Sequence, residues 1–173
     1  MKNINKNKVF VSTGFFKKLS PDEVMHIFYR NQIFDLEFSG GKYIDLKEIK
    51  NLTKFSKQIN LRIHNYFPPP KKSFVINLAS NDKNILKNSI KQIKKSILLA
   101  RKFKNKYFSF HAGFRIDPKV NKLGKRFNKY KMTDKTLAEK IFHDNLIKIN
   151  KFATKNKIKL LIENNVLTKE NLN

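Results

Sequence analysis

The sequence contains no cysteine and no long apolar run. Without cysteine there can be no disulfide framework and no zinc–thiolate site, so any metal site must be built from histidine and carboxylate side chains. No tract approaches the roughly 20 apolar residues of a membrane span. The apolar run at residues 9–11 is also too short for the core of a signal peptide. We therefore expect a cytoplasmic location and no membrane partner.

Acidic residues are scarce, because 13 Asp and Glu stand against 38 Lys and Arg, and the formal net charge is +25. Such a charge is typical of proteins that bind nucleic acid or another polyanion. The lysines are nevertheless scattered through every predicted helix instead of forming one block. Lys, Asn, Ile and Phe are also overused together, as an A/T-rich coding bias would produce. Charge alone therefore does not establish a nucleic-acid partner, and we do not favour one.

The chain has 173 residues, of which 40% are apolar and 12% aromatic, enough for one domain with a sizeable core over residues 1–173. Five tracts have the composition of strands: residues 9–12, 33–38, 61–64, 106–111 and 158–163. Helix-start signals lie between them, at Ser20, at Asp45, at Ser80 or Asn81, and at Thr133. Strands that alternate with helices are typical of βα units on a parallel sheet.

Functional side chains at strand ends, with longer loops after the strands than before them, favour a (β/α)8 TIM barrel over a doubly wound sheet. A complete barrel needs about 250 residues and eight strands. We therefore expect an incomplete α/β barrel of about five βα units, the N-terminal portion of a single domain.

Three predicted strands end in a side chain that can bind a metal, namely His64, His111 and Glu163. Because the ends of parallel strands converge at a barrel mouth, these side chains would hold a divalent ion there, Mn²⁺, Co²⁺, Zn²⁺ or Mg²⁺. A single histidine at a strand end is more commonly structural, but three such residues together favour a metal site. His26 and His143 fall within helical patterns and are interpreted as ordinary helix residues.

Four tracts carry a resemblance to a known family: the strand end at His64, residues 75–80 (VINLAS), residues 108–113 (FSFHAG) and residues 161–164 (LIEN). They resemble the xylose-isomerase-like barrels, which include sugar and sugar-phosphate isomerases and epimerases and the endonuclease IV group of abasic-site nucleases. The resemblance implies that His64 and His111 bind or flank a metal and that Glu163 ligates it. It places the remaining Asp, His and Glu ligands on later strands.

By this resemblance the function is a metal-dependent sugar or sugar-phosphate isomerase or epimerase, working by proton transfer through an enediolate. Glu163 and His111 would be catalytic, and Glu37, His64, Asn77 and Arg115 would bind substrate. The basic loop that contains Arg115 is equally well explained as a solvated surface, and Glu37 as part of a supporting salt bridge. Two alternatives stay open: an abasic-site phosphodiesterase and a non-catalytic barrel fragment. The expected partners are the sugar substrate, and either a second copy of the chain or a C-terminal barrel half.

Overall fold

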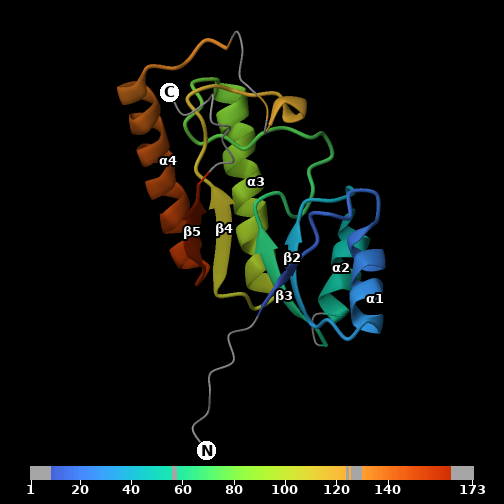
Figure 1. The fold of residues 1–173 in the computed structure, drawn as a ribbon. Helices are drawn as coiled ribbons and strands as arrows, with labels where there is room; N and C mark the ends of the chain where they lie inside the picture. The colour runs from blue at the N-terminus through green and yellow to red at the C-terminus, as the bar shows by residue number, and fades with distance from the viewer. Residues whose placement is uncertain (1–8, 56–57, 124, 126–129, 165–173) are drawn as a thin grey trace, which may run out of the picture.

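The computed structural model describes residues 9–55, 58–123, 125 and 130–164 (Figure 1). Five strands alternate with four α-helices along this part of the chain. The elements are β1 (Val11–Ser12), α1 (Pro21–Arg30), β2 (Asp35–Ser39), α2 (Leu46–Phe55), β3 (Asn60–His64), α3 (Lys83–Lys102), β4 (Tyr107–His111), a short 3-10 helix η1 (Val120–Lys122), α4 (Lys135–Lys155) and β5 (Lys159–Glu163). The strands form one sheet in the order β1-β2-β3-β4-β5, and every neighbouring pair is parallel. The predicted βα architecture is therefore confirmed.

The helices begin at capping residues whose side chains accept hydrogen bonds from the first turn. At α1, the Ser20 hydroxyl accepts from the Glu23 amide, and the Glu23 carboxylate accepts from the Ser20 amide. Asp45 and Glu48 form the same reciprocal pair before α2. Each arrangement satisfies amides that the helix leaves without a partner.

Two predicted caps are wrong by one or two residues. Asp82, and neither Ser80 nor Asn81, caps α3, because its carboxylate accepts from the Asn84 and Ile85 amides. The Ser80 hydroxyl is instead directed at a carboxylate in the loop after β4, Asp117. Asp134, and not Thr133, caps α4 by accepting from the Leu137 amide at 2.9 Å.

The two faces of the sheet differ in character because successive side chains of a strand point to opposite faces. One face is apolar and packs against the helices: α3 contacts β3 and β4, and α4 contacts β5. Its fully buried members include Leu36, Phe38, Ile63, Phe108 and Phe110. The other face carries Glu37, Arg62 and Ser109, so polar groups line the side that faces the interior of a barrel.

The apolar tract 74–79 forms no strand. Its backbone amides bond to side chains: the Ile76 amide donates to the Tyr66 hydroxyl at 2.7 Å, and the Asn77 amide donates to the Ser89 hydroxyl at 2.9 Å. Buried backbone groups need partners, and here side chains replace a neighbouring strand. None of the described helices is both long enough and apolar enough to cross a membrane.

Candidate metal centre

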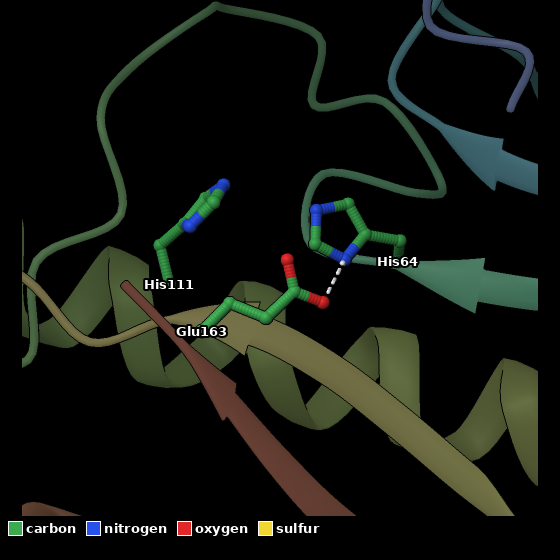
Figure 2. A group of neighbouring side chains, drawn as sticks. All are labelled: His64, His111 and Glu163. Atoms are coloured by element: carbon green, nitrogen blue, oxygen red, sulfur yellow. Dashed lines mark ion pairs between the residues drawn. The ribbon is translucent and has the colours of Figure 1, made fainter. Parts of the chain in front are cut away.

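The structure brings His64, His111 and Glu163 together at the carboxyl end of the sheet (Figure 2). Each offers one ligand atom, and these atoms all lie within 4.8 Å of one another. The strand register explains this proximity: His111 pairs with Glu163, and His64 pairs with Ser109, two residues before His111. Ser109 and His111 point to the same face of β4. All three candidate ligands therefore lie on the polar face.

His64 is the most enclosed of the three, with a side chain 11% exposed. Its Nδ1 atom lies 2.7 Å from the Ser109 hydroxyl and 3.5 Å from Oε1 of Glu163. Burial lowers the pKa of His64 and the proximity of His111 adds to this, whereas Glu163 and a contact with Ser109 act in the opposite direction. A lowered pKa favours the neutral imidazole, which is the form that binds a metal.

His111 is oriented by the backbone that follows β5. Its Nδ1 atom lies 2.9 Å from the carbonyl oxygen of Asn164. A carbonyl oxygen can only accept, so Nδ1 carries the hydrogen and Nε2 keeps its lone pair. The ring stands nearly perpendicular to that of His64, at 88°, with the ring centres 5.4 Å apart. The contact with Asn164 thus fixes a tautomer whose Nε2 can bind a metal.

Glu163 is 47% exposed and supplies the carboxylate of the cluster. A second carboxylate, Glu37 on β2, lies close enough to feel its charge. Burial raises the pKa of Glu37, the charge of Glu163 raises it further, and Arg62 opposes the change. Two carboxylates with different environments therefore share the polar face of the sheet.

Asn77 has a role that the sequence analysis did not anticipate. Its side chain is fully buried and its amide nitrogen donates to the carbonyl oxygens of Phe114 and Ile116 and to the Asp117 carboxylate. Its amide oxygen accepts from the backbone amides of Ala79 and Phe114. These contacts fasten the loop after β3 to the loop after β4. They occupy the side chain, so this geometry gives no support to Asn77 as a substrate contact.

Arg115 is exposed and holds the far end of the same loop. Its Nε atom donates to the Thr133 carbonyl at 3.1 Å, and its own carbonyl accepts from the Thr133 amide at 2.7 Å. No contact with the three clustered side chains is found among the described residues. Substrate binding by Arg115 stays a prediction, as do the catalytic roles of Glu163 and His111.

Sequence reasoning missed Ser109 and Asn164, which hold the two histidines. Ser109 could have been suspected, because it stands two residues before His111 and so shares its face of the strand. The Asn164 contact uses a backbone carbonyl and leaves no signal in the side-chain pattern.

The donor set suits a transition metal. Two imidazoles and one carboxylate match the ligands of Zn²⁺, Co²⁺ or Mn²⁺ better than the all-oxygen shells that Mg²⁺ and Ca²⁺ prefer. Three protein ligands also leave positions open for water or substrate, as in catalytic zinc sites. The residues present therefore fit a divalent metal.

A family model described as xylose isomerase-like TIM barrel matches residues 23–166. The chain belongs to this xylose isomerase-like TIM barrel family. The match includes all three clustered residues and confirms the resemblance carried by the four sequence tracts. Among curated proteins, none matches the sequence.

Solved structures of the same fold include a D-tagatose 3-epimerase-like protein, with a TM-score of 0.66 and 19% identity. D-psicose 3-epimerase from Clostridium cellulolyticum has a TM-score of 0.60 and 16% identity. Endonuclease IV from Thermus thermophilus has a TM-score of 0.51 and 12% identity. The matches cover 91%, 93% and 94% of this chain but 53% of each of those chains. The chain thus spans about half the length of these structures, and at such identities the likeness establishes the fold alone.

Proposed function

We propose that this chain supplies five strands of a divalent-metal-dependent enzyme that isomerises or epimerises a sugar or sugar phosphate. The observation that carries the proposal is the cluster of His64, His111 and Glu163 on the polar face of the sheet. A divalent cation held by such a cluster would polarise a carbonyl and the hydroxyl on the adjacent carbon, and so would acidify the hydrogen on that adjacent carbon. The similarity to epimerase structures supports the same interpretation.

The chain's own residues would then move the proton. Glu37 is the better candidate for this task, since its raised pKa brings a carboxylate closer to the range in which it can both accept and return a proton. Glu163, beside His64, would hold the metal. His111, with Nδ1 bonded to a backbone carbonyl, would present Nε2 to the metal or to a substrate hydroxyl.

The test is exchange of solvent deuterium into ketoses, followed by NMR in the presence of Mn²⁺, Co²⁺ or Zn²⁺. D-tagatose, D-psicose and their phosphates form the panel. We expect exchange that Glu163→Gln abolishes, because the amide keeps the shape of the side chain but loses its charge. Glu139→Gln, on the exposed face of α4, is the matched control and should leave exchange unchanged. Exchange that survives Glu163→Gln would contradict the proposal.

A second candidate is hydrolysis of a phosphodiester at an abasic site in DNA. Two imidazole donors suit a hydrolytic zinc site, and the fold is shared with endonuclease IV. A duplex with one abasic site, incubated beside the sugar panel, separates the two functions. Nicking without exchange would favour the nuclease, and exchange without nicking the isomerase. We favour the isomerase because Glu37 adds a second carboxylate suited to proton transfer.

A further inference from the structure

A cavity of about 530 Å³ lies between the two long loops at the carboxyl end of the sheet. Its walls come from the loop after β3, the first turn of α3 and the loop after β4, including η1. The apolar lining residues are Phe74, Val75, Ile85, Pro118 and Val120. The volume falls in the range of about 300–1,000 Å³ that small-molecule sites occupy. None of the three clustered metal ligands lines it, so the cavity is a separate site.

The lining contains one basic residue, and further lysines are its neighbours in the sequence. Lys119 belongs to the lining, Lys71 and Lys72 directly precede the lining segment that begins at Ser73, and Lys122 follows Asn121. The one acidic lining residue is Asp117. Both of its carboxylate oxygens already accept hydrogen bonds, from the side-chain amide of Asn77 at 2.8 Å and from the Ser80 hydroxyl at 2.9 Å. Asp117 is therefore held by the loop structure, and Lys119 is the lining residue whose charge is suited to an anion.

An apolar lining that also includes Lys119 is complementary to a ligand with a flat, weakly polar body and a phosphate. Phe74 is partly exposed and offers a ring on which a base can stack, and stacking on an aromatic side chain is tolerant of base identity. Ser73 and Asn121 add hydrogen-bonding groups that suit a base or a ribose. Lysine is a common partner of phosphate and acts as a point charge. We propose that this cavity binds a nucleoside phosphate.

The probe is ADP, titrated by calorimetry at an ionic strength of about 150 mM, where diffuse attraction to a +25 chain is largely screened. Inorganic phosphate, adenosine and decyl phosphate are titrated in parallel. We expect ADP to bind at least about tenfold more tightly than phosphate or adenosine, because it uses both the apolar lining and Lys119. Phe74→Ala should weaken adenosine and ADP together.

The decisive variant is Val120→Glu, which places a negative charge on an exposed lining residue without disturbing the core. The matched control is Leu137→Glu, the same charge added to an exposed apolar residue of α4. We expect Val120→Glu to weaken ADP binding by about tenfold or more and Leu137→Glu to leave it unchanged. Equal weakening in both variants would mean general charge attraction and would overturn the proposal.

Three further results would overturn it as well: no ADP binding at millimolar concentration, phosphate binding as tightly as ADP, and decyl phosphate binding more tightly than ADP. The last would assign the cavity to an aliphatic anion. The titrations contain no divalent metal, and Glu163→Gln should not change them. Failure of the cavity proposal is therefore distinguishable from failure of the proposed metal-dependent function.

Discussion

β4 and β5 lie side by side and have the same length, but they are buried to very different degrees (Figure 1). On β4, Phe108 and Phe110 are 0% exposed, and their rings stack with centres 5.8 Å apart. On β5, Leu161 is 43% exposed and Ile162 is 45% exposed. β4 has a strand on each side, whereas among the described residues β5 pairs with β4 alone.

The difference shows that an apolar strand pattern does not determine burial by itself. Both strands carry a histidine or glutamate at their last position, and both present apolar side chains to the helices. Of these two strands, the one with two strand neighbours fully buries the two apolar side chains on its helix-facing side, Phe108 and Phe110. We propose that the side of β5 away from β4 is where further strands or a second copy of the chain pack, since a strand edge that has no partner among the described residues favours association. The candidate metal centre spans this boundary, with Glu163 on the exposed strand.

The largest expected effect tests the burial difference itself. Phe110→Ala should lower the free energy of unfolding by about 3–5 kcal/mol, because it removes a fully buried ring. Ile162→Ala, at the β5 position that pairs with Phe110, should cost about 1 kcal/mol or less, since much of that side chain is already in water. Urea unfolding followed by circular dichroism measures both, with Phe110→Leu as a milder variant if the alanine protein does not fold. Equal losses of unfolding free energy at the two positions would contradict the difference in burial between β4 and β5.

A smaller effect concerns the loop that follows β4. Gly113 has a φ of +135°, and a Cβ added there would lie 2.6 Å from Oδ1 of Asn77. Gly41 also has a positive φ, of +114°, but open space around it. Both alanine variants suffer backbone strain, and only Gly113→Ala disrupts the Asn77 contacts.

We therefore expect Gly113→Ala to be less stable than Gly41→Ala by about 1–3 kcal/mol in the same unfolding assay. Metal binding should weaken as well, since the loop begins directly after His111. Equal stability of the two variants would mean that the Asn77 hydrogen bonds rearrange at little energetic cost and do not fix the end of β4.

The smallest expected effect is the pH dependence of stability that arises from His64, whose ring contacts Ser109 on β4 and Glu163 on β5. Its pKa in the folded protein is lowered below the ordinary value of about 6.5. The unfolded chain therefore binds a proton at a pH where folded His64 does not, and stability falls as the pH drops below about 6.5 towards the lowered pKa. His64→Asn should flatten this part of the profile.

Glu163→Gln should lower the pKa of His64 further, because it removes the charge that favours the imidazolium. NMR titration of the His64 ring protons measures this directly. A pKa that rises in Glu163→Gln would show that the β5 carboxylate does not act on His64.

The alternation of strand and helix signals was sufficient to predict the parallel sheet, and the strand-end positions of His64, His111 and Glu163 predicted which side chains gather. The register between strands was not predictable. His64 pairs with Ser109 and not with His111, so it lies one side-chain level below the other histidine. Nothing local in the chain encodes that offset, since it depends on how β3 and β4 pack together.

The loop contacts escaped prediction for a related reason. Ser80 and Asn77 have the composition of a helix cap and a polar site residue, but both bond to Asp117, roughly forty residues further along the chain. A local pattern of residues identifies candidates for such roles, and long-range contacts decide among them. The capping residue of α3 is Asp82 and not Ser80, since the Ser80 hydroxyl donates to the distant Asp117 carboxylate.

The central claim is that His64, His111 and Glu163 hold one metal ion, and calorimetric titration with Zn²⁺ tests it most directly. The chain is compared with His64→Asn, His111→Asn and Glu163→Gln, and with His143→Asn, which alters an exposed histidine of α4. The account predicts one Zn²⁺ per chain, affinity reduced about tenfold or more in each cluster variant, and no change in His143→Asn. The same affinity in all five proteins would contradict it.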